Sequence, residues 1–105
     1  MRFVETHVFT AAIGRHLDDE RYRQLQLALM LRPEQGPVMR GAGGLRKVRW
    51  ATVGAGKRGG LRVIYYWAPR HQVFYMVYAY TKTEQGDLTP AQTRQLSRVV
   101  REDFG

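Results

Sequence analysis

Residues 43–50 read GGLRKVRW, and residues 59–67 read GGLRVIYYW. Each copy opens with two glycines that interrupt the chain and continues with a Leu-Arg pair and a run of β-branched and aromatic residues, which is typical of a strand. The first run is cationic, whereas the second is apolar. A third run, QVFYMVYAYT, follows after the short turn PRH. The pattern predicts an antiparallel sheet whose three consecutive strands lie at 45–51, 61–68 and 72–81, with a flexible cationic link, GAGKRGG, between the first two.

Helical signals flank these strands on both sides. A first strand is predicted at 2–8, and residues 10–32 have the apolar spacing of two helices, capped by Thr10 and Asp18 and ended by Pro33. Near the C-terminus, Thr89-Pro90-Ala91-Gln92 has the cap hydroxyl, the N1 proline and the N3 glutamine of a capping box. The order β-α-α-β-β-β-α predicts one α+β domain over residues 1–105. We expect the helical hairpin to pack on one face of the antiparallel sheet, a C-terminal helix to follow, and the other face to stay free.

Charge is the most informative part of the composition. The 105 residues have a net charge of +8, and the stretch between Glu34 and Glu84 contains no acidic residue but nine cations. The rest of the chain holds eight cations and nine acids, so the whole excess lies in the middle. A basic surface that only aids solubility usually mixes both signs. The distribution therefore favours a polyanionic partner such as nucleic acid.

Several classes of function are excluded or disfavoured. Cysteine is absent and no apolar run reaches the ~20 residues of a membrane span, and the N-terminus lacks the pattern of a signal peptide, so we expect a cytoplasmic protein with no membrane partner. The histidines at 7, 16 and 71 lack metal-ligand spacing, and the carboxylate-poor centre disfavours a metal-dependent nuclease. No cofactor or metal is predicted, because the glycines also fit no phosphate-binding signature.

Strand alternation places the basic residues. Successive side chains of a strand point to opposite faces, so the apolar residues Val48, Val63, Tyr65, Val77 and Ala79 are expected beneath the helices. The opposite, uncovered face then receives a set of polar residues: Lys47, Arg49, Arg62, Lys82 and Tyr80. Cations that share a face repel one another unless an anion binds there, so this face is the candidate site.

Arg62 is the sharpest member of this set, because it interrupts an otherwise apolar strand. It is expected to grip a phosphate with two parallel hydrogen bonds. The alternative is an arginine that reaches solvent or pairs with an acid of the C-terminal segment such as Glu102. Further RNA contacts are predicted for Arg46, Lys57 and Arg58, and for Trp50, whose ring is a candidate for stacking on bases together with Tyr80.

Three blocks of the sequence resemble a known family. GAGGLRKVRW, GKRGGLRVIYYW and VYAYTKTEQGDLTPAQ are similar to the HigB-type branch of the RelE superfamily, the bacterial toxins of type II toxin–antitoxin modules. The resemblance runs from about residue 36 to residue 97. It implies a small α+β fold and a metal-independent endoribonuclease, an mRNA interferase that inhibits translation by cutting mRNA in the ribosomal A site. It also implies a cognate antitoxin, expected to be a helix-turn-helix protein.

The family's cationic site falls on Lys47, Arg49, Arg62 and Lys82, the residues that alternation places together. By this resemblance Arg62 holds the scissile phosphate, Arg49 and Lys82 stabilise charge, and Lys47 is the candidate base. Some relatives carry a tyrosine or histidine near the C-terminus as general acid, but residues 83–105 contain neither. Tyr80 is therefore a candidate acid, and proton transfer by a lysine or arginine of the site is the alternative. Other members poison DNA gyrase, so a non-catalytic toxin or a basic binding module is the alternative function.

Overall fold

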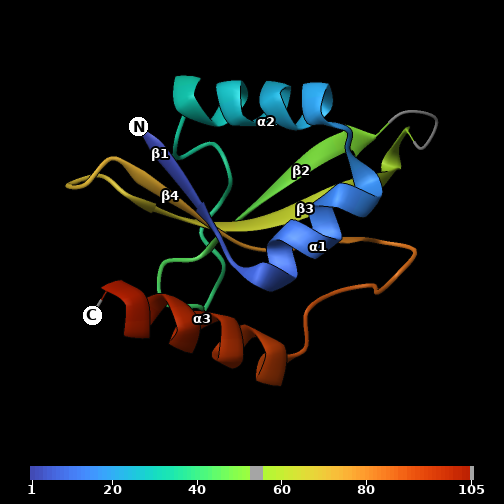
Figure 1. The fold of residues 1–105 in the computed structure, drawn as a ribbon. Helices are drawn as coiled ribbons and strands as arrows, with labels where there is room; N and C mark the ends of the chain where they lie inside the picture. Colours follow the sequence, from blue (N-terminus) through green and yellow to red (C-terminus); the bar gives the residue numbers. More distant parts are fainter. Residues whose placement is uncertain (53–55, 105) are drawn as a thin grey trace.

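A computed structural model describes the backbone of residues 1–52 and 56–104 and the side chains of residues 1–51 and 60–103. Figure 1 shows a four-stranded sheet between helices, and its elements follow one another in the predicted order. They are β1 (Arg2–Glu5), α1 (His7–His16), α2 (Asp19–Leu31), β2 (Arg46–Thr52), β3 (Gly56–Ala68), β4 (Val73–Thr81) and α3 (Pro90–Phe104). The predicted α+β architecture is confirmed.

The strands lie in the order β1-β4-β3-β2. The pairs β2–β3 and β3–β4 are antiparallel, which confirms the predicted meander. In contrast, β1 pairs with β4 in parallel, so the sheet is mixed and not antiparallel throughout. The local pattern of residues 2–5 marks a strand, but its direction depends on where the chain returns after two helices and two further strands.

The helix caps explain where the elements begin. Asp18 accepts a hydrogen bond from the amide of Arg21 at 2.8 Å, which confirms it as the cap of α2. At α3 the amide of Gln92 donates to the Thr89 hydroxyl at 3.1 Å and the Thr89 amide donates to the Gln92 side chain at 2.9 Å, as expected of a capping box. The prediction for α1 was wrong. Thr6, not Thr10, is its cap, so the first strand is shorter than expected.

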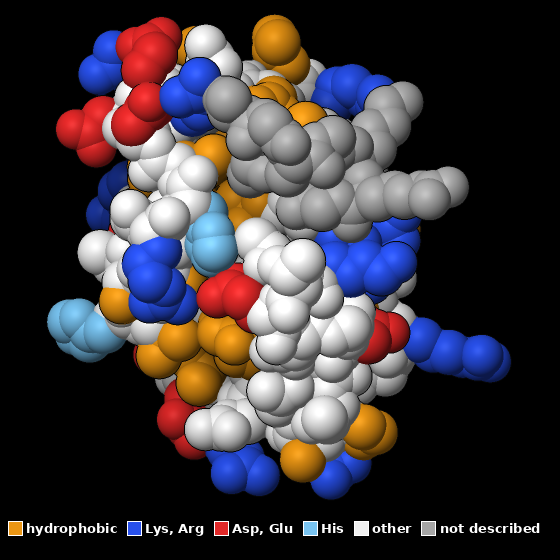
Figure 2. All heavy atoms as spheres, turned by 90° about the vertical axis from the view of Figure 1, so that its right-hand side faces the viewer, with side chains coloured by type: hydrophobic (Ala, Val, Ile, Leu, Met, Phe, Trp, Pro, Cys, Tyr) orange, Lys and Arg blue, Asp and Glu red, His pale blue; other side chains and the backbone are white. Residues whose placement is uncertain are grey.

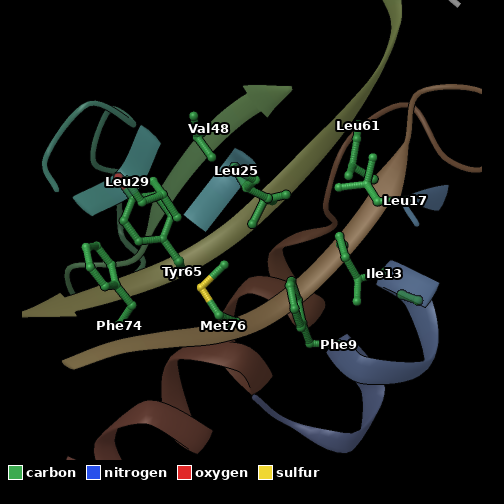
Figure 3. Close-up of a cluster of buried hydrophobic side chains, with 13 residues drawn as sticks. Phe9, Ile13, Leu17, Leu25, Leu29, Val48, Leu61, Tyr65, Phe74 and Met76 are labelled. Atoms are coloured by element: carbon green, nitrogen blue, oxygen red, sulfur yellow. The ribbon is translucent and has the colours of Figure 1, made fainter. Parts of the chain in front are cut away.

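The face of the sheet under α1 and α2 holds the larger core (Figure 3). Leu25 and Leu29 of α2 and Phe9 of α1 are fully buried there against Tyr65 and Met76. The strand residues Val48, Val63 and Ala79 belong to the same cluster, as alternation predicts. This core fixes which residues of β2, β3 and β4 are directed to the opposite face.

The opposite face is not free, which corrects the expectation from the sequence. A second core forms there from Ile64, Val77 and Tyr80 of the sheet, Leu45 of the segment before β2, and Val100 of α3. Figure 1 shows α3 on the side of the sheet away from α2. The helix packs there because its apolar stripe needs a partner. Only the part of this face that α3 and the 39–45 segment leave open remains available for a ligand.

A β-bulge changes the alternation within β4. Ile64 pairs with Tyr78 and Tyr65 pairs with Met76, so Val77 has no partner of its own on β3. Val77 therefore joins Tyr78 at the face of α3, where alternation had placed it on the opposite face. The strand β3 also differs from its prediction, because it begins at Gly56 and so includes part of the expected cationic link.

Among the described residues, none of the helices combines the length and the apolar character that a bilayer crossing requires.

Candidate functional site: a cationic row across three strands

Three polar residues form a row across the centre of the sheet. Arg49 of β2 pairs with Arg62 of β3, which pairs with Tyr80 of β4. Lys47 lies two residues from Arg49 on the same face of β2, opposite Ile64. Arg49 is exposed and Lys47 is half-buried. We call Arg49, Arg62 and Tyr80 the cationic row. Two like charges directly opposite on neighbouring strands are destabilising, so the row is a costly arrangement for a protein without a ligand.

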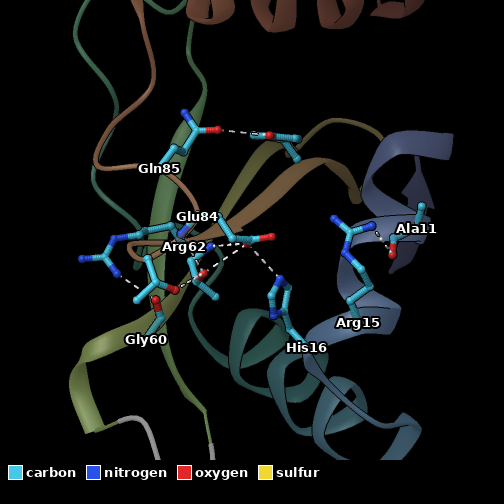
Figure 4. A network of polar contacts seen from close by, with 10 residues as sticks. Ala11, Arg15, His16, Gly60, Arg62, Glu84 and Gln85 are labelled. Atoms are coloured by element: carbon cyan, nitrogen blue, oxygen red, sulfur yellow. Dashed lines mark hydrogen bonds and ion pairs between the residues drawn. The ribbon is translucent and has the colours of Figure 1, made fainter.

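Arg62 is buried, which corrects the prediction that it faces solvent. Only 6% of its surface is exposed, and its Nη1 donates a hydrogen bond to the Gly60 carbonyl at 2.7 Å. Figure 4 shows the guanidinium turned toward Gly60. A guanidinium has five N–H donors, and within the described residues it makes no ion pair, so Glu102 is not its partner. Its charge is therefore available to an anionic ligand.

Tyr80 is also buried, although the sequence predicted an exposed ring. Its side chain is 2% exposed, and within the described residues its hydroxyl has no hydrogen-bond partner. Burial raises the pKa of Tyr80, and the charge of Asp87 raises it further, while Arg62 and Arg49 act to lower it. The phenol is thus protonated at neutral pH. It is a buried proton donor beside two arginines.

The segment after β4 contributes to this burial, because Leu88 packs against the core cluster that contains Tyr80. The Tyr78 hydroxyl donates to Gln85 Oε1 at 3.2 Å, and the Gln85 amide donates to Gln92 at 3.1 Å, so residues 85–88 run over this face toward α3. Asp87 lies 3.7 Å from Lys47 Nζ, so an acidic residue from outside the 34–84 stretch reaches the face that carries the predicted cations. The Asp87 side chain is 78% exposed, and an ion pair of this kind contributes about 0–1 kcal/mol.

Lys82 lies outside the sheet, which differs from the prediction. β4 ends at Thr81, and Lys82 is exposed in the following turn. Glu84 fixes that turn, because its carboxylate accepts from the Thr81 amide at 2.8 Å and contacts His16 Nε2 at 2.9 Å (Figure 4). The hydrogen bond from the Thr81 amide is the main cause that lowers the pKa of Glu84. Lys82 is thus held close to the end of the strand that carries Tyr80.

Two of the predicted RNA contacts lie on the other face of the sheet. Arg46 donates to the Gly36 carbonyl at 2.9 Å and contacts Glu34 at 3.4 Å, so it fixes the segment after α2. Trp50 is half-buried against the core under α1 and α2. Neither residue joins the cationic row. The side chains of Lys57 and Arg58 lie outside the described residues.

Two features of this region were missed at the level of sequence. No local sequence pattern marks Asp87 as part of the site, because it reaches Lys47 only through the path of the chain after β4. Arg94, Arg98 and Arg101 of α3 line a cavity of about 480 Å³ on the same face, and their spacing of four and three residues is the signal that could have found them. Figure 2, which views the right-hand side of Figure 1, shows basic side chains at several places around the outline of the molecule, with acidic side chains among them.

No metal centre is found in the part of the chain that the structure describes, since no group of three or more histidine, aspartate or glutamate side chains is placed to hold an ion there. The histidines are accounted for otherwise: His16 contacts Glu84, and His7 and His71 are exposed.

The fold and the row together define a small α+β protein with a basic sheet face. No family model matches the sequence. The structure is similar to that of an arginine double mutant of the E. coli toxin RelE in the free state, with a TM-score of 0.56 and 12% sequence identity over 80% of this chain and 85% of that chain. At this identity the similarity is one of fold. The chain therefore has a RelE-like fold, as the resemblance implied, and its assignment to the HigB-type branch stays a prediction.

Proposed function

We propose that this protein is the toxin of a type II toxin–antitoxin module and cleaves mRNA on the ribosome. The RelE-like fold and the cationic row support the proposal. The observation that carries it is the pair of Arg62 and Tyr80, which are neighbours across β3 and β4 and are both buried. Among the described residues the Tyr80 hydroxyl has no hydrogen-bond partner, and Arg62 donates one hydrogen bond, to the Gly60 carbonyl. A buried donor without a partner costs stability. A phosphate, which offers only acceptor oxygens and a negative charge, matches both donors.

The proposed chemistry assigns a role to each of these groups. The 2′-oxygen of the RNA attacks the adjacent phosphorus, the new O2′–P bond forms and the P–O5′ bond breaks. The products are a 2′,3′-cyclic phosphate and a 5′-hydroxyl. Lys47 is the proposed acceptor of the 2′-hydroxyl proton, and Tyr80 is the proposed donor of a proton to the leaving O5′.

Arg62 and Arg49 stabilise the charge that develops on the phosphate oxygens, and Lys82 adds to it from the turn after β4. The nucleophile is already part of the substrate, so the reaction needs no metal to activate water. Asp87 must give way at Lys47 when RNA binds, and the weakness of its exposed ion pair makes this inexpensive.

The partner that neutralises the toxin must bind the same positively charged residues. We propose a helix-turn-helix antitoxin whose toxin-binding segment is acidic and lies over the row, excluding RNA by occlusion. Association between such surfaces is accelerated by charge and slows as salt is added. With these proposed partners, the proposed site of action is the cytoplasm.

The test is induced expression in growing cells, with growth followed and RNA 5′ ends mapped within translated messages. Arg49→Ala is the sharpest variant, because Arg49 is exposed and we expect its loss to leave the fold intact. Arg62→Ala is less suitable, since it removes a buried side chain. Loss of one charge contact in the transition state typically costs about 3 kcal/mol, or ~100-fold in cleavage rate. The matched control is Arg23→Ala, an exposed arginine of α2, which is expected to cleave like the parent.

The alternative, a non-catalytic toxin, gives a different result. Growth arrest with intact messages and altered DNA supercoiling would identify a gyrase poison. Cleavage that is unchanged in Arg49→Ala at matched expression would remove the row from the mechanism. Cleavage of an untranslated copy of the same message would contradict the dependence on the ribosome.

A further inference from the structure

A second basic site lies between α3 and the glycine-rich turn before β2. The cavity of about 480 Å³ is lined by Arg94, Ser97, Arg98 and Arg101 on the helix side and by Gly41 and Gly43 on the turn side. Its floor includes Tyr66 of β3. None of its lining residues is acidic. It is distinct from the cationic row, because Arg62 and Tyr66 are four residues apart on the same strand, or about 13 Å.

The three arginines have no partner of their own. All three are exposed, and within the described residues none of them takes part in an ion pair or a side-chain hydrogen bond. Their spacing places them on neighbouring turns of one side of α3, over about 10 Å of helix axis. Like charges three and four residues apart destabilise a helix. The arrangement therefore costs stability unless anions bind along the helix.

The glycine-rich turn on the other side of the cavity lies very close to α3. Gly41 and Gly43 have φ values of 67° and 64°, a left-handed conformation that favours glycine. A Cβ at Gly43 would lie 2.5 Å from the Ser97 hydroxyl, so only glycine lets the turn approach the helix this far. Successive amide groups in such turns form concave sites for anions. The Gly41 and Gly43 amides donate no hydrogen bond within the described residues.

Three arginines in a row along α3 match several consecutive anions better than they match one anion. Three arginines along about 10 Å of helix, a serine hydroxyl and a neighbouring tyrosine are the groups that contact the phosphate backbone of nucleic acids. An acidic protein segment would also satisfy the charges, but the near-even spacing of the three arginines along one side of α3 matches the regular repeat of phosphates in a nucleic-acid strand.

We propose that this cavity binds consecutive phosphates of an RNA strand, as an anchoring site separate from the cleavage site. The inference rests on the proposed function, since it assumes that the protein acts on RNA. The α3 arginines would hold RNA without taking part in bond cleavage. They are positioning residues, and their loss is expected to weaken binding while cleavage of bound RNA proceeds at the parent rate.

The experiment measures the affinity of the full chain for a short single-stranded RNA whose 2′-hydroxyls are methylated, so that it cannot be cut. Affinity is followed by fluorescence anisotropy over a range of salt concentrations. The test variant replaces Arg94, Arg98 and Arg101 by alanine. The control replaces three exposed arginines of the helical hairpin, Arg15, Arg23 and Arg32, so both variants lose the same net charge.

For single-stranded RNA each phosphate contact contributes about 0.7 to the slope of log affinity against log salt. The α3 variant is expected to lose about 2 from this slope and about tenfold or more in affinity, whereas the control changes little. A third variant with lysines at the three positions is expected to keep the slope, which separates lost charge from lost fold. Thermal melting of each variant verifies that it is folded.

The outcomes distinguish this inference from the proposed function. A parent protein that binds no free RNA would overturn the anchoring site, whereas the proposed function is overturned only if translated messages stay intact when the parent is expressed. A parent that binds and cleaves RNA, with the same slope in both alanine variants, would overturn the anchoring site and leave the proposed function standing. An equal loss of affinity for a polyglutamate peptide would assign the site to an acidic protein partner and overturn the RNA assignment. A lower single-turnover rate on saturating cleavable RNA would make the arginines part of the cleavage site.

Discussion

Replacing Tyr80 by phenylalanine is expected to stabilise the protein and to inactivate it. The substitution removes only the hydroxyl, which is buried and has no hydrogen-bond partner within the described residues. An unsatisfied buried polar group costs about 1–3 kcal/mol. Its removal should therefore raise the free energy of unfolding by about this amount. For a domain of about 100 residues each kcal/mol shifts Tm by about 4 °C or more, so the gain is measurable by thermal melting.

The same substitution removes the proposed proton donor. General acid catalysis contributes about 10²–10⁴-fold, so cleavage is expected to fall at least ~100-fold. The matched control is Tyr78→Phe, on the same strand and face, with its ring 5.7 Å from that of Tyr80. The Tyr78 hydroxyl donates to Gln85, so this control should lose about 0.5–1.5 kcal/mol and keep its activity.

The two measurements test different parts of the reasoning. If Tyr80→Phe lowers the free energy of unfolding, the hydroxyl has a partner in the folded protein and the argument from burial is wrong. If Tyr80→Phe cleaves as fast as the parent, the phenol is not the acid. The structure predicts that Tyr80→Phe is more stable than the parent but does not cleave. It predicts that Tyr78→Phe is less stable than the parent but still cleaves.

Two further predictions concern stability. The pKa of Glu84 lies below its ordinary value of 4.5 because of the Thr81 amide, so its contribution is complete above about pH 4.5 and is lost as the pH falls through the folded pKa. Acid titration of the melting temperature should accordingly show a steeper loss for the parent than for Glu84→Gln, and parallel curves would mean that the contact adds nothing. Leu25→Ala removes a fully buried side chain of α2 and should cost about 2–5 kcal/mol in urea unfolding. Leu27→Ala, two residues away and 52% exposed, should stay within about 0.5 kcal/mol.

The parts of the fold that depend on neighbouring residues could be predicted from the sequence. The runs that became β2, β3 and β4, the Asp18 cap and the capping box at Thr89 are all signalled within a few residues of themselves. Alternation also placed Arg49 and Arg62 on one face and Val63 on the other, because a strand has only two faces.

The candidate site could be predicted only in part, since burial depends on segments that are distant in the sequence. Nothing near Tyr80 indicates that residues 85–88 will pass over it, and so the sequence predicted an exposed ring. The same segment brings Asp87 to Lys47. The parallel direction of β1 could not be predicted for the same reason, because a four-residue strand contains no signal for the strand with which it will pair.

The bulge at Val77 divides β4 into two parts with opposite phase. Met76, before the bulge, and Ala79, after it, both point to the helical hairpin. They are three positions apart, whereas in an uninterrupted strand residues on one face are separated by an even number of positions. The extra residue thus acts as a spacer between the hairpin turn and the end of the strand that carries Tyr80. A homologue that lost this one residue would have to rotate one half of the strand, exchanging the tyrosine of the row for a small apolar neighbour. The presence or absence of a residue at this position is therefore a marker, readable in any aligned sequence, of whether the row can exist.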